Sequence, residues 1–182
     1  RDWSSDVCSS DLESIRKICE EKPNFIFLQK GIISNLEDYK VVGCTLWSDI
    51  ESESYYRMND RNNIIINGQK LERIDLIKMH KADKIWLENN VDSNTIVMTH
   101  HLPSYELIHP DYKKEDFKIY NSGYASNLDE IVYRARLWIY GHTHRSSDIM
   151  FDEITRCICN PHGYYNDDDK FSGFTIKSFY LE

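Results

Sequence analysis

The chain has 182 residues, of which 41% are hydrophobic and 29% charged, and its formal net charge is −8 at pH 7. This composition is that of an ordinary globular protein and excludes a disordered or fibrous chain. A net acidic chain without a basic stripe disfavours a nucleic-acid backbone as the main partner. No stretch approaches the length of a membrane-spanning helix, so we expect no membrane partner.

The first twelve residues need separate treatment, because Arg1–Leu12 shows neither helical nor strand periodicity. This segment resembles a translated sequencing adapter, and the alternative is a native polar tail. We therefore expect residues 1–12 to be a non-native artefact and residues 13–182 to form one domain.

Hydrophobic periodicity predicts alternating helices and strands in the first half of the domain. The expected elements are a helix over Ser14–Glu21, strands over Phe25–Gln29 and Tyr39–Trp47, a helix over Leu71–Asn90 and a strand over Thr95–Met98. Residues 51–68 are polar, so we expect irregular structure there apart from the apolar run Ile64–Ile66.

The second half is expected to be richer in strands. Residues 109–123 contain glycine and few apolar side chains, which predicts a long loop. Ser126 followed by Asp129 resembles the start of a capped helix that runs to Arg134. Further strands are expected over Leu137–Tyr140, Ile149–Phe151, Thr155–Cys159 and Phe174–Leu181. The whole pattern predicts an α/β (α+β) domain.

Two histidine motifs each follow a short apolar run. Thr99–Pro103 reads Thr-His-His-Leu-Pro, and Gly141–His144 reads Gly-His-Thr-His. Buried strands that end at one sheet edge deliver side chains to the place where α/β proteins bind ligands. Neutral imidazole is the commonest metal ligand near neutral pH. We therefore predict that His100, His142 and His144 converge on a metal site.

Other suggestive residues have ordinary explanations. Cys157 and Cys159 share one face of a strand and lack Cys-x-x-Cys spacing, so we expect buried, reduced thiols, which favour a cytoplasmic protein. His80 lies in a charged helix and is expected on the surface, and His109 is expected to be a loop residue without a ligand. Asp167–Asp169 is expected to be a solvated turn rather than a cation site.

Taken together, the motifs resemble the C-terminal half of the calcineurin-like metallophosphoesterase superfamily. The most specific part is Trp-Ile-Tyr-Gly-His-Thr-His at 138–144, which follows Thr-His-His-Leu-Pro further along the chain. Gly43–Asp49, Tyr124–Leu128 and Asn160–Tyr164 are similar to stretches of bacterial members. The resemblance covers residues 13–182 and implies a β-sandwich flanked by helices, with two divalent metal ions at one edge.

The resemblance also implies individual roles. His100 and His142 would bind one metal ion and His144 the other, while His101 would line the substrate pocket or pack behind the ligands. The intact protein would hydrolyse phosphate esters with metal-bound hydroxide, so a phosphorylated small molecule or another phosphoester is the expected substrate. Mixed nitrogen and oxygen ligands would suit manganese, iron or zinc.

One departure from the family pattern is large. The upstream motifs Asp-x-His, Gly-Asp-x-x-Asp and Gly-Asn-His, which carry the remaining ligands and the general acid, do not occur in this sequence, so no catalytic residue is assigned. We therefore expect a chain truncated at its N-terminus, from a metallophosphoesterase that is active when complete and nearly inactive as this fragment. The alternative is a non-catalytic or degenerate module of the same fold that binds one metal ion or none.

Overall fold

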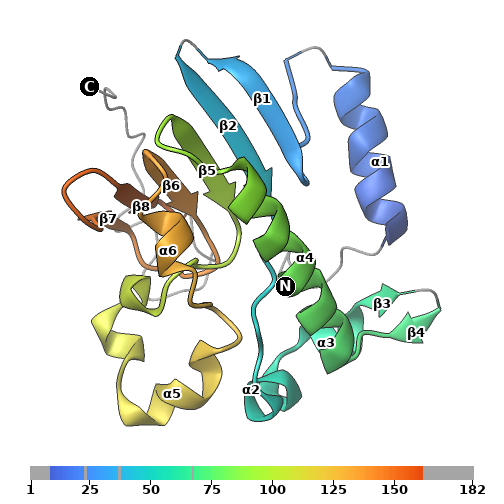
Figure 1. The fold of residues 1–182 in the computed structure, drawn as a ribbon. Coiled ribbons are helices and arrows are strands. Elements are labelled where there is room, and N and C mark those ends of the chain that lie inside the picture. The colour runs from blue at the N-terminus through green and yellow to red at the C-terminus, as the bar shows by residue number, and fades with distance from the viewer. Residues whose placement is uncertain (1–8, 23, 37, 67, 162–182) are drawn as a thin grey trace.

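The computed structural model describes residues 9–22, 24–36, 38–66 and 68–161. Its main strands are β1 (Gly31–Leu36), β2 (Tyr39–Cys44), β5 (Thr95–Thr99), β6 (Leu137–Tyr140), β7 (Ser147–Met150) and β8 (Arg156–Cys159). They form one sheet in the order β1-β2-β5-β6-β8-β7 (Figure 1). Helices and a mixed sheet in one chain confirm the expected α/β class.

The four central strands of this sheet are parallel, and the edge strands β1 and β7 run antiparallel to their neighbours. One row of paired residues crosses the sheet through Val42, Val97, Trp138 and Cys157, all with 0% exposure. Short, nearly continuous apolar runs suit strands that are covered on both faces, which explains why these segments are central. Parallel strands also bring their carboxyl ends to the same edge of the sheet.

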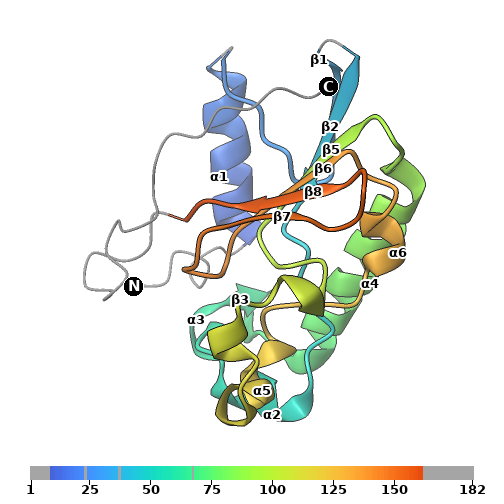
Figure 2. The same cartoon turned by 90° about the vertical axis from the view of Figure 1, so that its left-hand side faces the viewer.

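The helices are α1 (Ser9–Glu20), α2 (Ser52–Arg57), α3 (Asp60–Asn63), α4 (Arg73–Asn90), α5 (Glu115–Asn121) and α6 (Asp129–Val132), with 3₁₀ turns at Tyr105–Leu107 and Pro110–Tyr112. Figure 2 shows α4 and α6 on one side of the sheet and α1 on the other. The buried residues of α4 are three or four positions apart and form one inward-facing stripe: Leu76, His80, Asp83 and Leu87. No described helix is long and apolar enough to cross a membrane.

Buried apolar side chains form separate clusters. The largest joins the sheet to α4 and α6 and contains, among others, Val97, Trp138, Leu87, Val91 and Val132. Another joins the segment after β2 to the start of α4 and contains Ile50, Ile64, Leu71 and Leu76. A small hairpin of β3 (Ile65–Ile66) and β4 (Gln69–Lys70) lies beside this second cluster. The chain leaves the carboxyl end of β2 and runs down to α2 in Figure 1, so the second cluster lies below that edge of the sheet.

Several expected elements form close to their expected bounds. Leu137–Tyr140 is β6 with the expected ends, and the helix expected over Leu71–Asn90 is α4. The expected β-sandwich requires a second sheet packed against the first. Among the described residues the other sheet is the two-stranded β3–β4 hairpin, so this part of the chain forms one main sheet and no sandwich. The strand expected over Phe174–Leu181 and the turn expected at Asp167–Asp169 lie outside the described residues.

Other expectations were wrong. Phe25–Gln29 forms no strand, because Phe25 and Ile26 are exposed and the strand that pairs with β2 is the later segment β1. Residues 109–123 are not one long loop, since they form a 3₁₀ turn and α5. Because α5 buries none of its residues, its sequence shows no helical spacing of apolar side chains. Residues 51–68 likewise contain α2 and α3.

Two expected boundaries also moved. The helix expected to start at Ser126 starts at Asp129, because the Ser126 hydroxyl accepts a hydrogen bond from the Asp49 N–H at 3.2 Å. The first helix starts at Ser9, inside the segment expected to be non-native, so residues 9–12 extend the helix expected over Ser14–Glu21.

Candidate metal centre

The histidine motifs lie at the carboxyl ends of the neighbouring parallel strands β5 and β6. His100 directly follows β5, and His142 is the second residue after β6. Gly141 joins the two motifs, because its N–H donates to the His100 carbonyl at 3.0 Å. A Cβ atom at Gly141 would lie 3.4 Å from His100 Nδ1, an ordinary contact, so the backbone here lies beside the imidazole without requiring glycine.

Three imidazole rings cluster at this edge. The Nδ1 atom of His142 lies 3.0 Å from the Nε2 atom of His100. The ring of His101 lies 4.4 Å from that of His142 and 5.2 Å from that of His100, measured between centroids. The strand-end placement expected from the sequence therefore brings side chains 42 residues apart into direct contact.

His101 lies behind the other two rings. Its side chain is only 2% exposed, and its Nδ1–H donates to the Thr45 carbonyl at 3.3 Å. The Trp47 ring packs against it with centroids 5.3 Å apart. Of the two roles left open for His101, packing behind the ligands agrees with this burial better than lining a substrate pocket.

His144 is half-buried and lies close enough to His142 for its charge to lower the pKa of that ring. Within the described part of the chain, no group of three or more His, Cys, Asp or Glu side chains is arranged to hold a metal ion. The structure thus places His100 and His142 in contact and His144 near them.

Burial favours the neutral form of His142 and His101. The pKa of His142 is lowered to about 3, first by burial and then by the charges that His100 and His144 would carry. Burial and the same kind of repulsion, here from His142 and His100, hold the pKa of His101 well below its usual range. Neutral imidazole has a free nitrogen lone pair, which is the form that binds metal ions.

The contact between His100 and His142 fits a single cation. Two nitrogens at about 2.0–2.1 Å from one metal ion lie about 2.9 Å apart at a bond angle of 90° and about 3.4 Å apart at the tetrahedral angle. The observed separation of His100 Nε2 and His142 Nδ1 is 3.0 Å. Without a cation the same two atoms form an N–H···N hydrogen bond, so the pair is held together in either case.

His142 is presented by a tight turn of three residues. The Thr143 N–H donates to the Gly141 carbonyl at 2.7 Å, and His142 at the centre has φ 63°. This left-handed conformation costs a residue with a Cβ atom about 1–2 kcal/mol. Such strain is retained only where the surrounding structure fixes the backbone, and it is frequent at functional sites.

The backbone around His100 and His101 is fixed by groups that the sequence did not single out. The Thr45 carbonyl accepts the N–H groups of both histidines, each at 3.2 Å. The Thr99 hydroxyl donates to the His101 carbonyl at 2.8 Å and accepts from the buried Trp138 Nε1 at 2.9 Å. These are single polar atoms on or next to strands, and a sequence pattern carries no signal of such partners.

One aromatic ring also borders the site on its open side. The Tyr124 ring packs on His142 with centroids 4.6 Å apart, while 43% of Tyr124 remains exposed. The Leu102 N–H donates to the Tyr124 carbonyl at 3.0 Å, which attaches this residue to the segment after β5. A molecule that approached the histidines would therefore meet an exposed aromatic ring beside them.

The remaining sequence expectations have mixed outcomes. Cys157 and Cys159 are buried free thiols, as expected. His109 caps the short 3₁₀ turn by accepting the Asp111 N–H at 3.3 Å, in agreement with a loop role. The expectation for His80 was wrong, because it is 6% exposed: the inward stripe of α4 includes it although its neighbours are charged.

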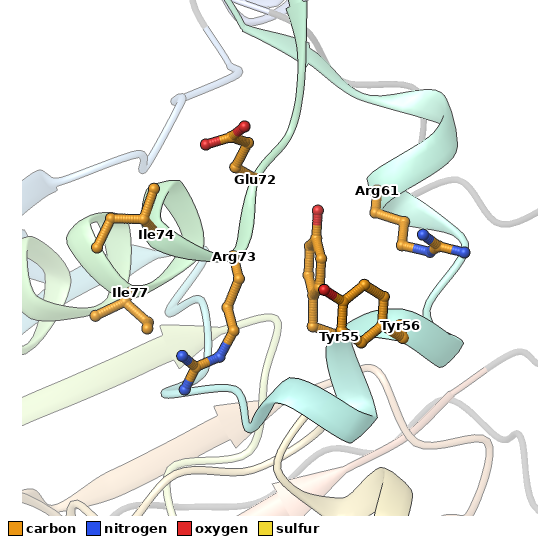
Figure 3. Close-up of a pocket in the computed structure, with 7 residues that line it drawn as sticks. All are labelled: Tyr55, Tyr56, Arg61, Glu72, Arg73, Ile74 and Ile77. Carbon is orange, nitrogen blue, oxygen red and sulfur yellow. The ribbon is translucent and has the colours of Figure 1, made fainter.

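A pocket of about 390 Å³ lies apart from the histidines, between α2, α3 and the start of α4 (Figure 3). It is lined by Tyr55, Tyr56, Arg61, Glu72, Arg73, Ile74 and Ile77. Two of its polar groups stabilise the fold: the Tyr55 hydroxyl donates to the Leu71 carbonyl at 2.9 Å, and Arg73 Nε donates to the Ile50 carbonyl at 2.7 Å. No histidine lines this pocket, so the candidate site remains at the sheet edge.

Comparison with known proteins gives one distant likeness. No family model matches the chain, and no solved structure matches it. The chain is similar to the uncharacterised protein L509 of Acanthamoeba polyphaga mimivirus. The identity is 28% over an alignment of 176 residues, and the match covers 88% of this chain. The match spans 62% of the length of that relative. Because the relative is itself uncharacterised, the function of this chain has to be inferred from its own residues.

Proposed function

We propose that this chain is the metal-binding C-terminal part of a metal-dependent phosphoesterase. The observation that carries the proposal is the contact of His100 and His142, from two neighbouring parallel strands, with nitrogens 3.0 Å apart. The Gly-His-Thr-His and Thr-His-His motifs that supply these rings resemble those of calcineurin-like phosphoesterases. The viral relative is uncharacterised, so it does not indicate an activity for this chain.

In this function His100 and His142 would hold one divalent cation, and His144 would contribute to a second. A cation bound there supplies Lewis-acid stabilisation of phosphoryl oxygens and a nucleophile at neutral pH. The chain's own residues do the positioning: the Thr45 carbonyl orients His100 and His101, and the turn at Gly141 directs His142 toward His100. The apolar packing of His101 against Trp47 keeps water out from behind the pair.

A second candidate is a non-catalytic module that binds one metal ion. It is favoured by the sequence, in which no Asp-x-His, Gly-Asp-x-x-Asp or Gly-Asn-His motif accompanies the histidines. Such a module would lack the carboxylate that bridges two cations and the general acid. It would still keep the His100–His142 pair, so metal binding alone does not distinguish the two candidates.

Hydrolysis of phosphate esters distinguishes them. The assay uses p-nitrophenyl phosphate and bis(p-nitrophenyl) phosphate with added Mn²⁺, on the 182-residue chain and on the product of the gene read further upstream. The longer protein is expected to turn over at least one ester, while the 182-residue chain is slower by about 10²–10⁴-fold, the usual contribution of general acid–base catalysis alone.

Two variants of the longer protein complete the test. His142→Ala is expected to lose at least about 100-fold in activity, since loss of a partner behind a metal ligand already costs about 10–100-fold. His109→Ala, outside both histidine motifs, serves as the matched control and is expected to keep its activity. A longer protein that is inactive on both esters, yet binds the metal ion, would favour the non-catalytic module.

A further inference from the structure

Helix α4 carries two buried polar residues that face the candidate site from behind. His80 is 6% exposed and Asp83 is 2% exposed. They are three positions apart and therefore lie on the same face of the helix. A buried carboxylate destabilises the fold unless its oxygens are paired, so the hydrogen-bond and ion-pair partners of Asp83 indicate its structural role.

Both side chains hold the segment that follows β2. Asp83 Oδ2 accepts the Leu46 N–H at 3.0 Å, and the other carboxylate oxygen pairs with Lys30 Nζ at 3.1 Å. His80 Nδ1 lies 2.5 Å from the Trp47 carbonyl, and because a carbonyl only accepts, Nδ1 carries the proton. One helix face thus fixes an N–H and a C=O of consecutive residues.

The segment needs such a restraint because its backbone is strained. Leu46 has φ 54°, in the left-handed region that residues with a Cβ atom avoid, and its side chain is fully buried. A residue in this conformation persists only when its surroundings hold it there. The carboxylate of Asp83 supplies that restraint through the Leu46 N–H itself.

The residue before Leu46 supports the histidine site. The Thr45 carbonyl accepts the N–H groups of His100 and His101 at 3.2 Å each, and the His101 ring at 3.3 Å. The peptide bond between Thr45 and Leu46 is rigid and planar. Its N–H is held by Asp83 on one side, and its C=O orients the histidines on the other, so a rotation of this one peptide would move both sets of contacts.

We infer that Asp83, through the Thr45–Leu46 peptide, and His80, through the Trp47 carbonyl, are positioning residues for the histidine site. The inference about geometry stands on the contacts above, and its consequence for metal affinity rests on the proposed function. Lys30 has a different task, since it neutralises the buried carboxylate without touching the peptide. Loss of the Asp83 acceptor should therefore loosen His100 and His101, whereas loss of the ion pair should not when the acceptor oxygen is kept.

Amide hydrogen exchange tests the geometric part. Asp83→Ala removes the acceptor, Asp83→Asn keeps an acceptor oxygen for Leu46 but loses the charge, and Asp83→Asn combined with Lys30→Met removes the ion pair without leaving a buried charge unpaired. In Asp83→Ala we expect the His100 and His101 amides to exchange at least about 10-fold faster, while amides in the middle of β6 stay protected. Asp83→Asn, alone or combined with Lys30→Met, is expected to keep the protection of both histidine amides.

A second variant and a measurement on the unmodified chain guard against loss of folding. His80→Phe keeps a buried ring but loses the donor to the Trp47 carbonyl, and it should speed exchange at the same two histidines. In the unmodified chain under low denaturant, the Leu46, His100 and His101 amides should open together, with one dependence on denaturant. Independent opening of the Leu46 amide, or unchanged exchange in Asp83→Ala, would overturn the inference.

Zn²⁺ titration by calorimetry tests the consequence for the site. We expect Asp83→Ala to bind Zn²⁺ about 10-fold or more weakly than the unmodified chain, within the range typical for groups that orient metal ligands, and Asp83→Asn to recover most of the affinity. If the unmodified chain binds no Zn²⁺, the proposed function fails while the exchange measurement still decides the positioning role. Equal Zn²⁺ affinity in all variants would show that Asp83 does not influence metal binding.

Discussion

The Nδ1 atom of His142 lies 3.0 Å from the Nε2 atom of His100, although 42 residues separate the two in the chain. The register of the sheet produces this contact, because Met98 pairs with Ile139 and the two parallel strands end almost side by side. His100 directly follows β5, and one residue, Gly141, separates β6 from His142. The pair is consequently a product of the sheet topology as much as of the motifs themselves.

The first prediction concerns the metal ligands. His100→Ala and His142→Ala should each weaken Zn²⁺ binding by at least about 10–100-fold, because the remaining imidazole is a single neutral donor. Isothermal calorimetry at pH 7.5 measures the change. His109→Ala serves as the control, since this residue caps a 3₁₀ turn and should leave the affinity unaltered. Unchanged Zn²⁺ binding in both site variants would show that the pair is not the ligand set.

The second prediction concerns stability against pH. The pKa of His142 is about 3 in the folded chain and about 6.5 in an unfolded one. Between these values the unfolded chain binds the extra proton, so the free energy of unfolding should decrease as pH falls below 6.5. The lowered pKa of His101 acts in the same direction.

Urea unfolding between pH 7.5 and 5 checks this, without added metal ions. His142→Gln should unfold with a weaker dependence on pH over that interval, because one of the two buried imidazoles no longer takes up a proton on unfolding. Stability that is constant or that rises on acidification would contradict the buried, neutral state of these rings.

The third prediction concerns the hydrogen bonds behind His101. Thr99→Val should destabilise the protein by about 1–3 kcal/mol, because the Trp138 Nε1–H would be buried without an acceptor. Trp138→Phe should also lower the free energy of unfolding, because it removes the hydrogen-bond donor and replaces the indole with a smaller ring. The double variant should cost less than the sum of the two, since neither partner is then left unpaired. Strict additivity in urea unfolding would mean that the two side chains are not coupled.

The fourth prediction compares two glycines. A Cβ atom at Gly43 would lie 2.9 Å from the Leu28 Cβ and 3.0 Å from the Met98 carbonyl oxygen, so Gly43→Ala should destabilise by about 1–3 kcal/mol. At Gly141 the nearest atom would be His100 Nδ1 at 3.4 Å, an ordinary contact, so Gly141→Ala should change stability by less than about 0.5 kcal/mol. Thermal unfolding of the two variants side by side gives the comparison, and a larger loss at Gly141 would contradict it.

Sequence patterns predicted the elements that bury an apolar stripe. β6 and α4 were found from their periodicity, because a covered strand and an amphipathic helix both leave a clear signal. α5 was missed because it buries no residue and is attached by polar contacts, such as that between the Ser122 hydroxyl and the Glu51 N–H at 3.0 Å. Phe25 shows the reverse error, an apolar run that the fold leaves exposed.

The convergence of His100 and His142 was predictable from the sequence, but the groups that support them were not. Gly-His-Thr-His and Thr-His-His indicated His100 and His142, since imidazoles at strand ends are a local pattern. The burial of His80 was missed, because the charged residues around it in the sequence do not indicate which face of the helix packs against the core. The Thr45 carbonyl could not be predicted at all, because every residue has a carbonyl and only the packing of β2 beside β5 selects this one.

The left-handed turn at His142 sets a limit on how the protein can be stabilised. Glycine or asparagine would adopt its φ of 63° more readily than histidine does, so substitutions chosen only for folding stability would tend to replace the imidazole. An engineered variant with a higher melting temperature could therefore lack the proposed metal ligand His142 although its folding stability had increased. Exposed apolar positions far from the turn, such as Ile65 and Met150, are better places for stabilising changes.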